Sequence, residues 1–139
     1  MLLTYQTEQW PDVLCELQGY WPAHWLEVAT HRDKVPLDPN YVEYDRLHNT
    51  GSLHVTTVRH AGELVGYVTA VVRPHLHYAH SLSGFFDLYY LAPAHRRGMA
   101  GVTMLKQAER ALKARGVERL FTGTKLSKDA SRIFERLGW

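Results

Sequence analysis

Apolar residues near the beginning of the chain recur every three or four positions, which is the spacing of one face of a helix. Over residues 10–30 they are Trp10, Val13, Leu14, Leu17, Trp21, Trp25 and Val28. Pro22 lies inside this pattern, and we expect the helix to be interrupted or to restart there, because proline lacks an amide hydrogen. Asp38 and Pro39 have the residue types of a helix N-cap and a first helical position, which predicts a second helix over about 39–49.

The middle of the chain has the composition of β-strands, rich in valine, threonine and aromatic residues. Residues 53–58 and 64–72 flank a glycine-containing turn and predict a hairpin that Pro74 closes. A histidine-rich connection over 75–80 leads into a third apolar run at 85–91. Three neighbouring strands of this kind predict an antiparallel meander.

The apolar spacing returns to that of helices after the third strand. Residues 98–115 place apolar side chains on one face and charged ones on the other, and Gly116 is typical of a helix C-terminus. Residues 117–122 favour a short strand. The segment Ser127-Lys128-Asp129 favours the start of a last helix with three inward side chains, Ile133, Phe134 and Leu137.

Length and composition restrict the class of protein. The 139 residues predict a single domain, 1–139, and 45% hydrophobic with 22% charged residues is typical of soluble globular proteins. Sixteen basic against fourteen acidic residues is too even for a nucleic-acid binder, and no apolar run approaches the roughly 20 residues that span a bilayer. Cys15 is the only cysteine and no signal peptide is visible, so we expect a cytoplasmic protein that binds neither nucleic acid nor membrane.

The segment with the clearest chemistry is the basic turn 95–101, between the third apolar run and the amphipathic helix. Arg96 and Arg97 supply positive charge, while Gly98 and Gly101 leave backbone N–H groups uncovered where a helix begins. This combination predicts a site for an anionic group such as phosphate; the alternative is a surface turn with two solvated arginines. No Gly-Lys-Ser/Thr loop and no Gly-x-Gly-x-x-Gly near the first strand are present, which argues against ATP and dinucleotide binding.

The predicted element order β-α-α-β-β-β-α-β-α, with the basic turn between the fourth strand and the third helix, resembles the GNAT family of acyl-CoA-dependent N-acetyltransferases over nearly the whole chain. The family's turn reads Gln/Arg-x-x-Gly-x-Gly/Ala, and Arg-Arg-Gly-x-x-Gly is a variant of it. The segments Tyr90-Leu91-Ala92-Pro93 and 134–139 are similar to a GNAT subgroup common in tailed phages. The resemblance implies a GNAT fold of the mixed α/β (α+β) class, with a central sheet that contains antiparallel strands.

The resemblance also implies that acetyl-CoA is the cofactor. Its pyrophosphate would be bound by the N–H groups of the turn, and Arg96 and Arg97 would add charge. The main chain near Tyr90 and Leu91 would pair with pantetheine as an added strand does. The turn residues concerned are Arg97, Gly98, Met99, Ala100 and Gly101.

Acetyl transfer to an amine needs a base and a proton source for the departing thiolate. Asp87 lies on the strand where the family often places a carboxylate base; the alternative is an aspartate that hydrogen-bonds to the backbone at a strand end. The family's acid is commonly a tyrosine at the position of Phe134, so the proton would come from water or from a residue such as Tyr89 or Tyr90. Because Cys15 lies in the predicted first helix, we expect direct attack by the amine rather than an acetyl-cysteine.

The acceptor site is expected among aromatic residues of the first two helices and the histidine-rich connection. Its candidates are Trp25, Tyr41, Tyr44 and His77; aromatic residues at helical spacing also serve as core. The histidines of the connection could instead be solvated, or bind zinc. No cysteine or carboxylate nearby completes a set, and we predict no metal site. The pattern selects no acceptor beyond a small-molecule or peptide amine.

The family normally continues past the Leu-Gly-aromatic segment into two more strands, whereas this sequence stops at Trp139. We therefore expect those strands to be absent. Either a second copy completes the sheet edge in a homodimer or the chain is a shortened form. The alternative to an enzyme is a non-catalytic GNAT-like protein that binds CoA or has a structural role, for example in a virion.

Overall fold

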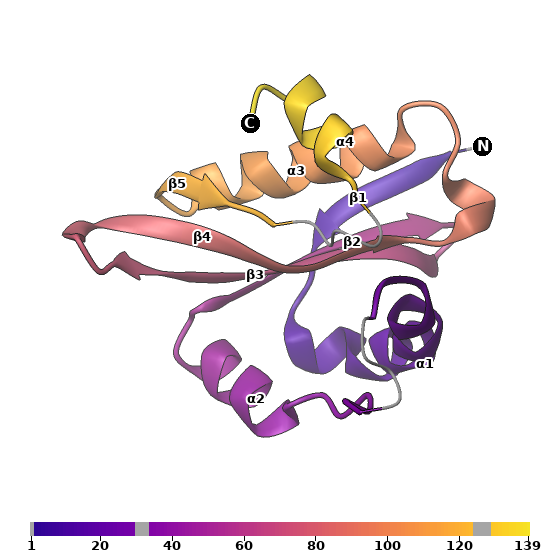
Figure 1. Cartoon of the computed structure of the whole chain (residues 1–139), viewed down its shortest axis with the longest axis horizontal. Coiled ribbons are helices and arrows are strands. Elements are labelled where there is room, and N and C mark those ends of the chain that lie inside the picture. The colour runs from indigo at the N-terminus through magenta and orange to yellow at the C-terminus, as the bar shows by residue number, and fades with distance from the viewer. Residues whose placement is uncertain (1, 30–33, 124–128) are drawn as a thin grey trace.

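A five-stranded sheet lies between two layers of helices in the computed structural model, which describes residues 2–29, 34–123 and 129–139 (Figure 1). Helices α1 and α2 cover one face, and α3 and α4 cover the other. The chain order confirms the predicted order, with one added 3-10 turn, η1. The elements are β1 (Leu3–Thr7), α1 (Trp10–Val28), α2 (Tyr41–Asn49), β2 (Leu53–His60), β3 (Glu63–His75), β4 (Tyr78–Leu91), η1 (Pro93–His95), α3 (Ala100–Ala114), β5 (Val117–Phe121) and α4 (Ser131–Arg136).

The sheet is mixed, as the sequence predicts. Strands β1 to β4 are neighbours in chain order and pair antiparallel, whereas β5 pairs parallel to β4. Ala61 and Gly62 both have positive φ angles, 51° and 83°, and form the tight turn between β2 and β3. The predicted antiparallel meander is therefore confirmed.

The first two helices differ from the predictions in two details, the expected break at Pro22 in α1 and the N-cap residue of α2. Helix α1 runs through Pro22 without interruption, because Pro22 and Gln18, whose carbonyl loses its amide partner, are both exposed and that carbonyl stays available to water. The cap of α2 is Asn40 rather than Asp38: the amide of Glu43 donates to the Asn40 side chain at 3.1 Å. That hydrogen bond satisfies one of the free N–H groups of the first turn.

The predicted histidine-rich connection is mostly strand. Strand β3 continues past Pro74 to His75, and β4 already begins at Tyr78. Pairing of β2 with β3 stops at Val71, so among the described strands only β4 pairs with β3 at Pro74. The amide hydrogen that Pro74 lacks is therefore not needed for a hydrogen bond to β2.

In the last helix the predicted inward position of Ile133 is wrong, because its side chain is 37% exposed, while Phe134 is buried. The segment Ser127-Lys128, where we expected the helix to start, lies outside the described residues.

Each face of the sheet carries its own core. Between the sheet and α1 and α2 the buried side chains are mostly large and aromatic: Trp10, Leu17, Trp21, Tyr67 and Tyr90. Between the sheet and α3 and α4 they are Val58, Val68, Met104, Leu105, Ala108 and Phe134. Among the described residues, no helix has both the length and the apolar character needed to cross a membrane.

His54 on β2 is a buried titratable group outside the site. It is 1% exposed, and its Nε2 lies 2.8 Å from Thr56 Oγ1, while Nδ1 has no partner in the described part of the chain. Burial, with a smaller contribution from the positive charge of Arg115, lowers the pKa of His54 to about 4. Between these two values the folded protein keeps His54 neutral, whereas in the unfolded chain His54 is protonated below its ordinary pKa of 6.5.

We predict that His54 makes stability fall as the pH falls from about 6.5 to about 4, by about 3 kcal/mol in total at the lower end. Above pH 6.5 both states are neutral and the loss is absent. Urea unfolding at pH 7 and pH 4.5 checks this, with His54→Gln expected to flatten the decline. The matched control is His80→Gln at an exposed position. Equal declines in wild type and His54→Gln would refute the assignment.

Candidate active site

A β-bulge at Asp87 divides β4 into two parts. Leu88 lies opposite Thr69 and Phe86 opposite Ala70, which leaves Asp87 as the extra residue. Before the bulge, residues 82–85 of β4 pair with β5. After it, no described strand pairs with that edge, so residues 86–91 of β4 present an open strand edge.

The hydrogen bonds at the end of β4 show which main-chain groups face this edge. The amide of Ala92 donates to Val65 of β3 at 2.8 Å, while the carbonyl of Leu91 points the other way and accepts from Arg96 Nε at 2.5 Å. Because main-chain groups of successive strand residues point to opposite sides, those of Tyr89 also face away from β3. Tyr89 and Leu91 therefore lie on the open edge, whereas the main chain of Tyr90 faces β3.

The basic turn lies between η1 and the start of α3, next to this edge. Gly98 has a φ of 58°, a conformation that favours glycine, and α3 begins directly after Met99. Within the described ranges, the N–H groups of Gly98, Met99, Gly101 and Val102 donate to no protein acceptor. A Cβ added at Gly101 would meet no described atom within 4 Å. The turn thus has uncovered amides at the positive end of α3.

The two arginines of the turn have different surroundings. The Arg96 guanidinium forms two hydrogen bonds with Glu27 of α1, at 2.6 and 2.7 Å, and lies 5.3 Å from the centre of the Tyr90 ring. The hydrogen bonds to Glu27 raise the pKa of Arg96. Arg97 is exposed and forms no ion pair with a described residue. Arg96 therefore ties the turn to α1, and Arg97 is the arginine whose charge is available to a ligand.

Asp87 is held by two hydroxyl groups on the α2 side of the sheet. Tyr44 of α2 donates to Asp87 Oδ2, and Thr69 Oγ1 donates to the same oxygen at 3.0 Å. Burial raises the pKa of Tyr44, and the negative charge of Asp87 adds to the effect, so Tyr44 remains a donor. The hydrogen-bond partners of the carboxylate are thus side chains of α2 and β3 rather than the backbone groups of the alternative interpretation.

The candidate proton donors Tyr89 and Tyr90 lie on opposite faces of the sheet. The Tyr89 hydroxyl donates to the carbonyl of Gly123 at 3.1 Å, and its ring meets Phe134 edge-on with centres 5.4 Å apart. Tyr90 is 6% exposed, and its ring stacks on that of His24 of α1 with the ring centres 4.8 Å apart. Of the two, Tyr89 is the one beside Phe134.

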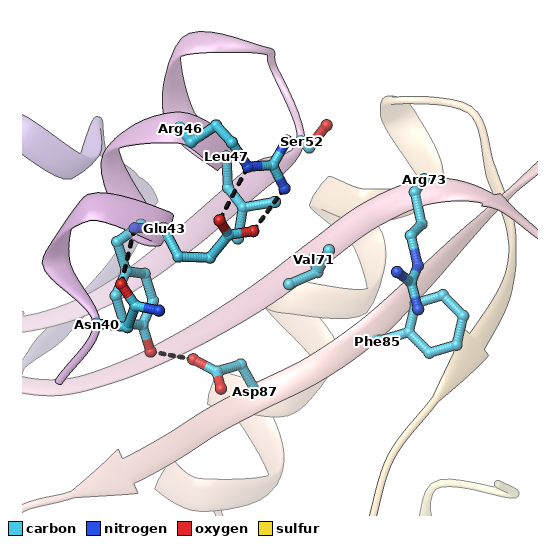
Figure 2. A pocket seen from close by; sticks show the side chains of 10 residues that line it. Asn40, Glu43, Arg46, Leu47, Ser52, Val71, Arg73, Phe85 and Asp87 are labelled. Carbon is cyan, nitrogen blue, oxygen red and sulfur yellow. Dashed lines mark hydrogen bonds and ion pairs between the residues drawn. The ribbon is translucent and has the colours of Figure 1, made fainter. Parts of the chain in front are cut away.

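Two hollows flank Tyr44. One, of about 580 Å³, lies between α2 and strands β3 and β4, with Asp87 in its lining (Figure 2). The other, of about 470 Å³, lies between α1 and residues 35–40 and is lined largely by apolar side chains. Tyr44 and Asn40 line both hollows.

Of the four predicted acceptor residues, two line the hollows and two do not. Tyr44 lines both hollows and Trp25 lines the second. The Tyr41 ring stacks on that of Trp21 with the ring centres 5.8 Å apart, and Tyr41 lines neither hollow. His77 lies at the β3–β4 turn, where its ring is 5.4 Å from that of His75, and it also lines neither. The structure therefore brings Tyr44 and Asp87 together and leaves His77 apart.

His24 is a lining residue of the second hollow that the sequence analysis missed. It is 6% exposed, and its Nδ1 lies 2.9 Å from the Tyr67 hydroxyl. Burial lowers the pKa of His24, so the ring is neutral at neutral pH. A lone histidine between two tryptophans of a helix has no distinguishing sequence signal. Within the described ranges, no three His, Cys, Asp or Glu side chains are grouped to hold a metal ion.

Comparison with known proteins places the chain in a family. The profile of the acetyltransferase (GNAT) family matches residues 10–139. The chain belongs to the GNAT family. It is 26% identical to aminoglycoside N(6')-acetyltransferase type 1 from Klebsiella aerogenes over 130 residues, which cover 93% of this chain and 74% of the relative. The subgroup common in tailed phages stays a prediction.

Solved structures agree with the GNAT fold. An aminoglycoside acetyltransferase from an uncultured soil metagenomic sample superposes with a TM-score of 0.75 at 17% identity, covering 99% of this GNAT chain and 91% of the other. A protein from Clostridium acetobutylicum described as a predicted acetyltransferase, solved with acetyl-CoA, has a TM-score of 0.71 at 11% identity, with 99% of this chain and 90% of the other covered. The mixed α+β GNAT fold expected from the sequence is confirmed.

Proposed function

We propose that this GNAT protein transfers an acetyl group from acetyl-CoA to a primary amine of a small molecule or peptide by direct attack of the amine. The proposal depends above all on one observation. The open edge of β4 lies next to the uncovered amides at the start of α3, and Asp87 marks the bulge where that edge begins.

The residues present fit acetyl-CoA. The amides of Gly98, Met99 and Gly101, at the positive end of α3, would bind the pyrophosphate, and the exposed Arg97 would add a charge-assisted contact. The main chain of Tyr89 and Leu91 would accept the pantetheine arm as an added strand. The open space at Gly101 admits a ligand close to the backbone. The bound cofactor would supply an acetyl group already activated as a thioester.

The chain's own groups account for the proton movements. An amine loses a proton as its nitrogen bonds to the acetyl carbon, and Asp87, held by Tyr44 and Thr69, would take that proton and pass it to water. As the carbon–sulfur bond breaks, the Tyr89 hydroxyl would give a proton to sulfur and recover one from solvent. Tyr89 would thus do the work of the family's acid tyrosine, since Phe134 carries no proton to give.

Two further observations support the proposal. Cys15 is exposed on α1 and lines neither hollow, in keeping with direct attack rather than an acetyl-cysteine. The curated relative acetylates an amine of an aminoglycoside, so a small-molecule amine is an acceptor for a protein of similar sequence.

We predict that Arg97→Glu weakens acetyl-CoA binding at least about tenfold, because a carboxylate would then face the pyrophosphate. Isothermal titration calorimetry measures this directly. Arg110→Glu is the matched control, since it makes the same charge change at an exposed position of α3, the helix that follows the turn. Equal affinities for Arg97→Glu and Arg110→Glu would place the cofactor elsewhere, and no heat from wild type would remove the proposal.

We predict that Asp87→Asn lowers kcat/KM for amine acetylation about a hundredfold with acetyl-CoA affinity unchanged, because an amide takes up no proton. Tyr89→Phe should lower kcat, whereas Tyr90→Phe, one residue away on the opposite face, should have little effect. Thiol release with a panel of amines measures both. Full activity of Asp87→Asn would exclude it as base, and cofactor binding without thiol release from any amine would favour the non-catalytic alternative.

A further inference from the structure

The charged side chains that line the hollow between α2 and strands β3 and β4 differ in whether they have a partner of opposite charge (Figure 2). On the α2 wall, Glu43 and Arg46 pair with each other, with Arg46 Nη2 2.5 Å from Glu43 Oε1. Asp87 is held by hydroxyl groups. Arg73 of β3 forms no ion pair with any described residue, and its guanidinium carbon lies 5.0 Å from the centre of the Phe85 ring. The charge of Arg73 is therefore available to a bound molecule.

Asp87 and Arg73 lie at opposite ends of an apolar floor. Val71 and Phe85 face each other across β3 and β4, and Asp87 and Arg73 lie beyond this pair in opposite directions. Between three and four residues of strand separate their levels, which is roughly 12 Å between the Cα levels. The Arg73 side chain lies back over Phe85, so the charged ends are closer than that.

Phe85 is itself fixed in place. Its ring stacks on that of Phe121 of β5, with centres 5.1 Å apart and planes 10° apart. The floor between the two charges is therefore a firm apolar surface rather than a mobile side chain. An apolar chain can lie along it with one end at each charge.

We propose that this hollow selects amines that carry a carboxylate at the far end of an apolar chain, with the amine at Asp87 and the carboxylate at Arg73. This rests on the proposed function, because that function makes Asp87 the amine end. A guanidinium matches a carboxylate with two parallel hydrogen bonds, which gives the far end a geometric as well as a charge preference.

The same charges act against a molecule with several ammonium groups. Glu43 is already paired with Arg46, and Asp87 is occupied by the reacting amine, so a second ammonium at the far end would face Arg73. Like-charge contact of this kind discriminates against the wrong ligand. The acceptor of this chain is thus chemically distinct from the polycationic aminoglycosides that give the curated relative its name.

The test compares ω-aminooctanoate with α,ω-diaminooctane, which share the amine and the chain and differ only at the far end. Titration calorimetry with excess CoA present measures binding without turnover. Wild type should bind the aminocarboxylate at least about tenfold more tightly. Arg73→Gln should remove the preference, Arg73→Lys should keep part of it and Arg73→Glu should reverse it. Arg110→Gln, an exposed control on α3, should leave it unchanged.

Equal binding of the two amines, preference for the diamine, no measurable binding of the aminocarboxylate, or a preference that persists in Arg73→Gln would each overturn the inference. Failure of the proposed function has a different signature, namely no binding of acetyl-CoA or no thiol release with either amine. Circular dichroism of each variant confirms that the comparison is made between folded proteins.

Discussion

The backbone of β4 imposes the constraint on which the site depends. Its outer edge is paired with β5 only as far as Phe85, and at Asp87 an extra residue bends the strand. Beyond that point the N–H groups of Tyr89 and Leu91 face an edge that no described strand covers, and unpaired strand groups favour an added extended chain. The same bulge places the Asp87 carboxylate on the α2 face, where Tyr44 and Thr69 fix it. One irregularity thus creates both an open strand edge and a candidate base.

Arg96 connects this edge to the basic turn. Its Nε donates a hydrogen bond to the carbonyl of Leu91, while its two Nη atoms donate to the carboxylate of Glu27 at the end of α1. The turn that follows is thereby fixed against β4, and the free amides of Gly98 and Met99 lie at the positive start of α3. Arg96, which the sequence suggests as a phosphate contact, is thus also a structural link, whereas the exposed Arg97 forms no ion pair with a described residue.

The sequence predicts the order of the elements, the antiparallel meander and the turn, because these follow from local apolar spacing, glycine and proline, whereas the mixed sheet is implied only by the family resemblance. It does not predict what depends on distant contacts. Pro22 is tolerated because the carbonyl that loses its amide partner lies on the exposed side of α1, and Pro74 because it lies past Val71, where the pairing of β3 with β2 stops. The pairing of Arg96 with Glu27, and of Asp87 with Tyr44, joins residues 69 and 43 positions apart, so no local pattern reveals either. His24 and Arg73 gain their importance only from the hollows that the fold makes around them.

In the proposed complex, acetyl-CoA joins the end of β4 to the start of α3. Amide hydrogen exchange with and without acetyl-CoA tests it most directly, because exchange slows where an N–H group gains a partner. We expect slower exchange at Tyr89 and Leu91 and at Gly98, Met99 and Gly101, with the rest of α3 unchanged. Unaltered exchange at both segments in the presence of saturating acetyl-CoA, or protection confined to other parts of the chain, would contradict it.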